Sequence, residues 1–328
     1  MIMYPIKYIP IHCRKGDCYV SEIGSKHIVR WKWFFESDFQ GVPSWSSLFG
    51  NVDNSIRDIQ NYTYLYEIFR LELGQKGLDE GQIKEKFVKK IRMFSDQLSR
   101  NVDHTLNKFG DLLRTHNINN IITTNYDNGI EHILQNACGY HKETPEKLVP
   151  EKIYSIRTYK SFYNETANHR IKLWKIHGDL DRVKSITLGF DQYCGALSKL
   201  EDYVKGSYYS THGEPSPKCE TPMLKKCKNP DLFDHISWAE LFFNTNVYIV
   251  GFGMDFSEID IWWLLNKRAR IKLEVSEIQN SIIYLYNKDY ESKASKPELF
   301  AVLDAFGIIY KPISADPSYL NNIFNNMT

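Results

Sequence analysis

Four residues that can do chemistry each follow an apolar, strand-like run of the sequence. They are Asn125 after IITT, His177 after IKLWKI, and Gly251 and Gly253 after NVYIV. A side-chain amide can orient a ligand, an imidazole with a pKa near neutrality can act as a base, and a glycine lets a ligand approach the backbone. Ligands of an open α/β sheet bind outside the carboxyl ends of its strands. The pattern therefore predicts a ligand site along one edge of a sheet.

Each of these residues also has an ordinary structural explanation. Asn125 can tie its own loop together through hydrogen bonds. His177 can be a satisfied histidine at a strand end, and two glycines can form a plain turn between a strand and a helix. A single signal carries little weight, so it is the order of all three along one chain that favours a binding site.

The rest of the pattern predicts the elements that position these residues. Strands are expected at 27–35, 121–124, 171–176, 185–188, 246–250, 281–286 and 308–313. Helices are expected at 128–134, 235–243, 257–270, 297–306 and 319–324, whereas residues 1–26 show no regular pattern. Strands that alternate with helices predict an α/β fold: a Rossmann-like, doubly wound, mostly parallel sheet in one domain over residues 1–328.

Two segments interrupt this alternation. Residues 60–118 repeat apolar side chains near the helical period and predict a helical subdomain inserted before the Asn125 strand. Residues 198–234 are polar and rich in glycine and proline, which indicates a long loop or small insertion that could act as a lid.

Composition excludes several classes of protein. The net charge of +1, from 41 basic and 40 acidic residues, argues against a general nucleic-acid binder. The six cysteines show no C-x-x-C spacing, so we expect no structural zinc and no metal cofactor, and their scatter favours reduced thiols in a cytoplasmic protein. No apolar run approaches the length of about 20 residues that spans a membrane.

The three motifs together resemble the bacterial sirtuin-like domain, and more narrowly its antiviral, NAD-consuming branch. They read TTNYD at 123–127, WKIHGD at 174–179 and YIVGFGMDFSEID at 248–260. The run SEID followed by WWLL is typical of those bacterial proteins. The resemblance covers about residues 41–287, and it implies a Rossmann-like sheet that binds NAD across the ends of its strands.

The resemblance also implies roles at the nicotinamide end of NAD. Asn125 matches the family's asparagine beside the nicotinamide ribose, where it would hold the ribose or an attacking water. His177 matches the family's essential histidine, a general base for a ribose hydroxyl or water, with Gly178 beside it. Thr124 and Asp127 would shape the nicotinamide end.

At the other end of NAD, the resemblance implies a second set of contacts. Gly251, Gly253 and Ser257 would line the adenosine ribose and phosphate side. Asn287, directly after a predicted strand, matches a position that often contacts the adenosine. No metal is needed for this chemistry.

Two departures from the family pattern bear on the activity. Sirtuin-like domains usually carry a Gly-Ala-Gly turn a short way before a Gly-x-Pro. Here Gly-Val-Pro stands at 41–43, but Trp-Phe-Phe at 33–35 holds the expected place of the glycines. Bulky aromatic residues cannot copy a glycine loop whose amides cradle a pyrophosphate. The two C-x-x-C pairs of protein deacetylases are also missing, which favours free NAD as the substrate.

The expected function is therefore that of an NAD glycohydrolase acting in antiphage defence by abortive infection. No sensor segment is left over, so we expect regulation through a homo-oligomer or through a partner such as a HerA-like ATPase or a nucleotide-sensing protein. Two alternatives stay open. The chain could be a non-catalytic module that binds NAD or ADP-ribose or serves as an assembly subunit, and a protein deacylase is a weaker third.

Overall fold

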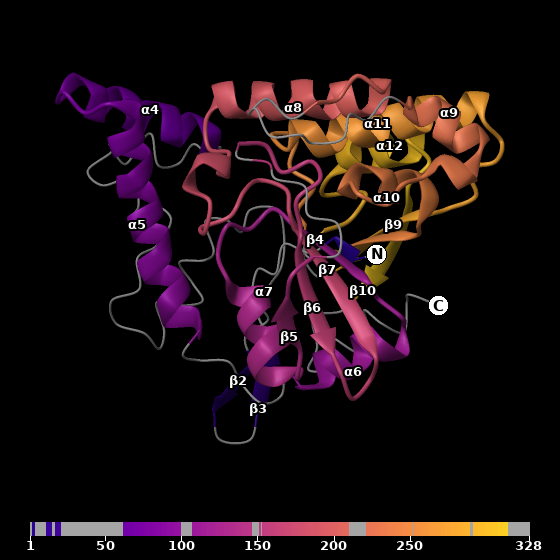
Figure 1. Cartoon of the computed structure of the whole chain (residues 1–328), viewed down its shortest axis with the longest axis horizontal. Helices are drawn as coiled ribbons and strands as arrows, with labels where there is room; N and C mark the ends of the chain where they lie inside the picture. Colours follow the sequence, from indigo (N-terminus) through magenta and orange to yellow (C-terminus); the bar gives the residue numbers. More distant parts are fainter. Residues whose placement is uncertain are drawn as a thin grey trace.

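A mixed eight-stranded sheet runs through the part of the chain that the computed structural model describes (Figure 1). That part comprises residues 2–3, 11–14, 17–20, 62–99, 107–145, 151, 153–209, 221–250, 252–288 and 291–313. The strands, in sheet order, are β10 (Ile309–Ile313), β9 (Ile282–Asn287), β8 (Val247–Val250), β1 (Ile2–Met3), β4 (Asn120–Thr123), β7 (His169–Lys175), β6 (Lys160–Asn164) and β5 (His141–Glu143). A separate antiparallel hairpin joins β2 (Ile11–Arg14) and β3 (Asp17–Val20).

The six strands from β10 to β7 run parallel, and the antiparallel strands β6 and β5 extend the sheet, with β5 at its edge. In β4 and β7, Ile121 lies opposite Leu173 and Thr123 opposite Lys175. The carboxyl ends of β4, β7, β8 and β9 therefore share one edge of the sheet.

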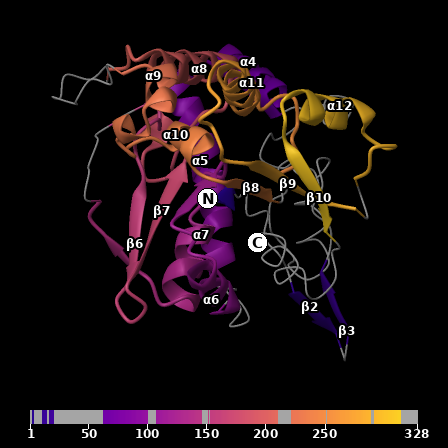
Figure 2. The same cartoon turned by 90° about the vertical axis from the view of Figure 1, so that its right-hand side faces the viewer.

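Helices cover both faces of the sheet. They are α4 (Tyr62–Gln75), α5 (Glu80–Ser99), α6 (Asn107–Thr115), α7 (Gly129–His132), α8 (Phe190–Lys205), α9 (Met223–Lys228), α10 (Trp238–Asn244), α11 (Ile259–Glu274) and α12 (Pro297–Ala305). Short turns of other helix types are η2 (Ile133–Ala137), η3 (Val183–Ser185) and η4 (Pro230–Leu232). Figure 2 shows α8, α9, α11 and α12 together on one side of the molecule and α6 and α7 on another.

Alternating side chains along each strand build two cores, one per face. Ile122 and Trp174 point into a core with α8 to α12, whereas the adjacent Ile121 and Leu173 point into a core with α6 and α7. Strand side chains alternate between faces with a period of two, so an all-apolar strand feeds both cores. This is why β4, β8 and β9 are so rich in β-branched residues.

The helices α4 and α5 contribute to a third core. Their side chains, including Tyr66 and Phe87, pack against Leu180, Ile186 and Leu188. The loop that follows β7 is thus enclosed by α4 and α5, which lie at the left of Figure 1.

The structure confirms most of the predicted strands and corrects two predictions. The strands expected at 121–124, 171–176, 246–250, 281–286 and 308–313 are β4, β7, β8, β9 and β10. The strand expected at 27–35 and the helix expected at 319–324 lie outside the described residues.

The first correction concerns residues 1–26, which we expected to be irregular. Ile2–Met3 instead forms β1, between β4 and β8 in the sheet, and β2 and β3 follow it. A strand this short shows no periodicity, because long-range pairing alone defines it.

The second correction concerns residues 185–188, which form no strand. Ser185 ends η3, and the Thr187 amide donates to the His177 carbonyl at 2.8 Å, which closes a loop. Of the two β-branched residues, Ile186 packs into the third core and Thr187 closes this loop through its backbone amide.

The two predicted insertions are described only in part. Residues 60–118 hold α4, α5 and α6, and α6 packs onto the sheet through Leu113. In the segment 198–234, Met223 and Cys227 of α9 enter the main core, while 210–220 lie outside the described residues. No helix in the described ranges is both long and apolar enough to cross a membrane.

Candidate functional site

Neighbouring parallel strands place Asn125 and His177. Thr123 lies opposite Lys175, and each of the two candidate residues follows its strand by two positions. The Ile176 amide still donates to the Thr123 carbonyl at 3.0 Å, so the two backbones leave the sheet side by side. The amide and the imidazole therefore belong to adjacent loops at one sheet edge.

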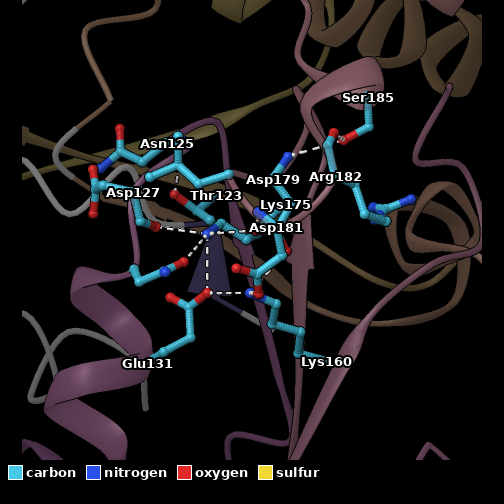
Figure 3. Close-up of polar contacts among 12 residues, drawn as sticks. Thr123, Asn125, Asp127, Glu131, Lys160, Lys175, Asp179, Asp181, Arg182 and Ser185 are labelled. Carbon is cyan, nitrogen blue, oxygen red and sulfur yellow. Dashed lines mark hydrogen bonds and ion pairs between the residues drawn. The ribbon is translucent and has the colours of Figure 1, made fainter. Parts of the chain in front are cut away.

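Short hydrogen bonds shape the Asn125 loop. The Asn125 backbone amide donates to Thr123 Oγ1 at 3.0 Å (Figure 3). The Gly129 backbone amide donates to Asp127 Oδ1 at 2.9 Å. The second bond satisfies a backbone amide at the start of α7, although Asn128 and not Asp127 occupies the N-cap position. Thr124 and Asn125 are half-buried.

A buried group of charges, which we call the lysine cluster, lies beneath this loop. It comprises Lys160, Lys175, Glu131 and Asp179 (Figure 3). Lys175 Nζ donates to the Asp127 carbonyl at 2.6 Å and to Glu131 Oε1 at 2.9 Å, and it lies 3.5 Å from Asp179 Oδ1. One ammonium group thus joins the Asn125 loop, α7 and the loop after β7.

Lys160 completes the lysine cluster from β6, the neighbour of β7 in the sheet. Its Nζ lies 3.0 Å from Glu131 Oε1 and 2.8 Å from Asp179 Oδ2. Burial alone would raise the pKa of the Asp179 carboxyl, but Lys175 and Lys160 outweigh it and lower that pKa to about 2. The carboxylate is thereby held ionised at neutral pH.

A second buried group, which we call the histidine cluster, comprises His177, Glu258 and Asp260. His177 Nε2 lies 3.0 Å from Asp260 Oδ2 and 3.7 Å from Glu258 Oε2. Both carboxylates come from the start of α11, which follows the glycine loop after β8. The Tyr193 ring of α8 packs edge-on against the imidazole, with ring centres 5.3 Å apart.

The two carboxylates change the protonation of His177. Burial lowers the pKa of this imidazole, but Asp260 and Glu258 outweigh burial and raise the pKa to about 9. The pKa of His177 therefore lies above the near-neutral value that we expected, because two acidic side chains from a distant part of the chain pack against it. At neutral pH the ring is an imidazolium that donates to Asp260.

The histidine cluster is also a group of the kind that can hold a metal ion, since one nitrogen and two carboxylate oxygens lie within 4.8 Å of one another. Here the protonated ring itself supplies a positive charge next to the carboxylates. That no metal takes part stays a prediction.

Gly178 connects the two clusters. Its φ of +106° is in the region that side chains rarely adopt. A Cβ atom there would lie 2.3 Å from the Ser185 carbonyl oxygen and 2.5 Å from Ile186 Cα. The close approach of the chain to itself explains this glycine, and its predicted contact with a ligand stays a prediction. Tyr126 closes the same loop by donating its hydroxyl to the Thr187 carbonyl at 2.6 Å.

The described residues predicted for the adenosine side lie at the end of β9 or in the segment that follows β8, its neighbour in the sheet. Gly253 and Ser257 follow β8 and are half-buried, and the Ser257 amide donates to Asp255 Oδ1 at 2.8 Å. Asn287 is the buried last residue of β9, next to β8 in the sheet. Gly251 lies outside the described residues.

Sequence reasoning missed the charged partners. Glu258 and Asp260 were part of a quoted motif, but nothing assigned them to His177, which lies 83 positions away from Asp260. Lys160 and Lys175 looked like ordinary strand lysines. A usable signal was the placement of Asp260 in the first turn of a helix that follows a strand of the same sheet edge.

Comparison with known proteins identifies the family. The model of the SIR2-like domain matches residues 119–302, which is more than half of the chain and includes both clusters. No curated protein sequence gives a significant match. SIR2-like domains include NAD-dependent enzymes, and the chain belongs to the SIR2-like domain family.

Proposed function

We propose that this chain is an NAD glycohydrolase, which cleaves NAD to nicotinamide and ADP-ribose. The observation that carries the proposal is the placement of Asn125 and His177 in adjacent loops at the carboxyl ends of β4 and β7. An amide and a titratable imidazole at this edge are the groups needed to orient a ribose and to move a proton.

The sheet supports a dinucleotide ligand. The six parallel strands have the order β7-β4-β1-β8-β9-β10, in which the chain moves outward on one side of β1 and then on the other. In doubly wound, Rossmann-like sheets the ligand binds where this reversal occurs, which here is between β1 and β8. We take 60–118 as the helical insertion of this fold and 198–234 as an insertion that could act as a lid.

The charges near the edge suit the reaction. Loss of neutral nicotinamide leaves oxocarbenium character on the ribose, and fixed dipoles and carboxylates stabilise that charge in a site shielded from water. Asp260 balances the imidazolium, and Glu258 adds a further carboxylate. Asn125 would hold the ribose or the attacking water in line with the broken bond.

The remaining site residues fit the two ends of NAD. Thr124, Asp127 and Gly178 are assigned to the nicotinamide end, since they border the Asn125 and His177 loops. Gly251, Gly253, Ser257 and Asn287 are assigned to the adenosine end, since they follow β8 or end β9. NAD is the substrate in this assignment.

The biological proposal is antiphage defence in the cytoplasm. NAD depletion would stop the growth of an infected cell, so the activity must be held off until infection. We propose control by self-assembly or by a partner such as a HerA-like ATPase or a nucleotide-sensing protein. Comparing turnover by the chain alone and by the chain with the product of a neighbouring gene tests this control.

Turnover of NAD by two variants tests the assigned roles. We expect Asn125→Ala and His177→Ala each to lower the rate of nicotinamide release at least about 100-fold, the usual range for a positioned acid or base. Asn119→Ala and His141→Ala change the same residue types at exposed positions and should retain the activity. Unchanged turnover in both site variants would refute the roles.

A second candidate is a module that binds NAD or ADP-ribose without turnover. It is favoured by the raised pKa of His177, which leaves little neutral base at pH 7. Calorimetry that shows NAD binding, together with no nicotinamide release between pH 7 and 9 even with a partner present, would select this candidate.

A further inference from the structure

We propose that Asp260 is a positioning residue that anchors Nε2 of His177 and thereby makes Nδ1 the nitrogen that exchanges a proton with the substrate. This inference rests on the proposed function, since it concerns how the same histidine works. Asp260 acts through the imidazole and is not assigned a contact with NAD.

The first step is the geometry of the pair. Nε2 and the Asp260 oxygen are 3.0 Å apart, a hydrogen-bonding distance, and both side chains are buried. The Ile261 amide donates to the other oxygen, Asp260 Oδ1, at 3.0 Å. The carboxylate is therefore held by its own helix while one oxygen holds the ring.

The second step concerns the opposite side of the ring. Among the described residues, Nδ1 makes no hydrogen bond, whereas Nε2 is bound. Tyr193 contacts the ring edge-on at an interplanar angle of 78°, which limits its rotation. A ring fixed by a carboxylate at one nitrogen and packed edge-on with an aromatic ring presents the other nitrogen in a defined direction.

The third step is the proton balance. In the neutral ring, Nε2 carries the hydrogen that it donates to Asp260, so Nδ1 holds the lone pair. Nδ1 takes a proton from the attacking water, directly or through a ribose hydroxyl. The water oxygen bonds to C1′ of the ribose, and the bond from C1′ to the nicotinamide nitrogen breaks. The resulting imidazolium is stabilised by Asp260, and the proton then returns to solvent.

The charged and titratable groups around the ring come from three elements. Glu258 and Asp260 stand at the start of α11, Tyr193 on α8 and Tyr126 in the loop after β4. The two carboxylates are the described groups that raise the pKa of His177. Asp260 is closer than Glu258 by 0.7 Å, since the two distances are 3.0 and 3.7 Å, so it should have the larger influence.

Asp260→Asn is the variant that separates charge from position. The amide oxygen of asparagine can still accept from Nε2, so the ring stays oriented while the negative charge is lost. The wild-type rate should rise with pH toward about 9 as the ring loses its proton. In Asp260→Asn this rise should move to lower pH by at least one pH unit, with kcat changed more than KM.

Three further variants serve as references. Asp260→Ala should lose the orientation as well as the charge and lower kcat at every pH. Glu258→Gln should shift the pH profile in the same direction by less. Asp231→Asn, an exposed carboxylate on η4, should leave the profile where it is. Circular dichroism and melting curves on each variant identify those that fold.

Nuclear magnetic resonance of the His177 ring gives a readout that does not depend on turnover. We expect the ring hydrogen on Nε2 in the neutral wild-type ring, and a lowered His177 pKa in folded Asp260→Asn. A hydrogen on Nδ1, or the same pKa in both proteins, would overturn the inference. If both ring results hold but no variant or wild type releases nicotinamide, the glycohydrolase proposal fails and the Asp260 anchor stands.

Discussion

The lysine cluster and the histidine cluster lie on either side of Gly178, yet they are built on opposite plans. In the lysine cluster two ammonium groups face the buried carboxylates of Glu131 and Asp179. In the histidine cluster one imidazole faces two carboxylates. The first cluster holds permanent charges in balance, and the second holds a single charge that depends on pH.

This difference suggests two roles: the lysine cluster supports the loops, and the histidine cluster exchanges protons. The Lys175 ammonium donates to the Asp127 carbonyl and the Asn128 side-chain amide and lies beside two carboxylates, so this side chain fixes three segments in place. The pKa of Lys160 is also raised: burial opposes protonation, but Glu131 and Asp179 outweigh it. His177 can lose its proton within an accessible pH range. The lysine cluster holds the segment around His177 rigidly, and a rigid support suits a group that must transfer protons.

The largest expected effect comes from removing the central cation of the lysine cluster. Lys175→Met roughly keeps the length of the side chain but removes its positive charge. Glu131 and Asp179 then stay buried with only part of their negative charge balanced, and the hydrogen bond to the Asp127 carbonyl is lost. Breaking a buried ion pair on one side costs about 3–5 kcal/mol. Urea denaturation should show this loss in the free energy of unfolding.

A matched change outside the clusters serves as the control. Lys225→Met makes the same replacement at an exposed position, on helix α9, and should lower the free energy of unfolding much less. If Lys175→Met lowered the stability no more than this control, the lysine cluster would not be the support that we describe.

The two clusters should respond to pH in opposite directions, and the larger response belongs to His177. Its pKa is raised from 6.5 to about 9 in the folded protein, so its stabilising contribution is full below pH 6.5 and is lost as the pH rises to 9. At about 1.4 kcal/mol per unit of pKa shift, the loss is about 3 kcal/mol. Denaturation of wild type and His177→Gln between pH 6 and 9.5 should show converging stabilities.

The Asp179 response has the reverse sign. Its pKa is lowered from 3.8 to about 2, so its contribution is present above pH 3.8 and is lost as the pH falls toward 2. This loss, of about 2 kcal/mol by the same conversion, should disappear in Asp179→Asn. Parallel pH profiles for wild type and both variants would show that neither carboxylate set interacts with its cation as described.

Much of the candidate site followed from local pattern. Asn125 and His177 end apolar strands, and adjacent parallel strands bring such ends to one edge of a sheet, so their placement could be predicted without coordinates. The paired charges could not. Asp260 reaches His177 only because α11 starts above the same edge, and Lys160 reaches Asp179 only because β6 pairs with β7.

The same limit applies to the fold. Apolar runs reveal the strands β4, β7, β8, β9 and β10, but β1 is a two-residue strand and β5 a three-residue one, and such lengths carry no period. The pKa of His177 departs from its near-neutral expectation for a related reason, since a pKa depends on neighbours in space rather than in sequence.

The smallest expected effect tests whether the clusters are coupled through Gly178. Gly178→Ala places a methyl group against the Ser185 and Ile186 backbone at a φ of +106° and should cost about 1–3 kcal/mol. Gly74→Ala is the matched control: it lies in α4 with nothing within 4 Å of its added carbon, and should stabilise the helix by about 0.5–1 kcal/mol.

Because Gly178 stands between His177 and Asp179, its substitution should weaken both pH responses at once. Denaturation of Gly178→Ala should therefore show a smaller loss of stability than wild type both from pH 3.8 toward 2 and from pH 6.5 toward 9. If only the acidic response changed, the lysine cluster would depend on the loop and the histidine cluster would be held by α11 alone. That result would place the anchor of His177 in Asp260 and its helix rather than in the turn that carries the imidazole.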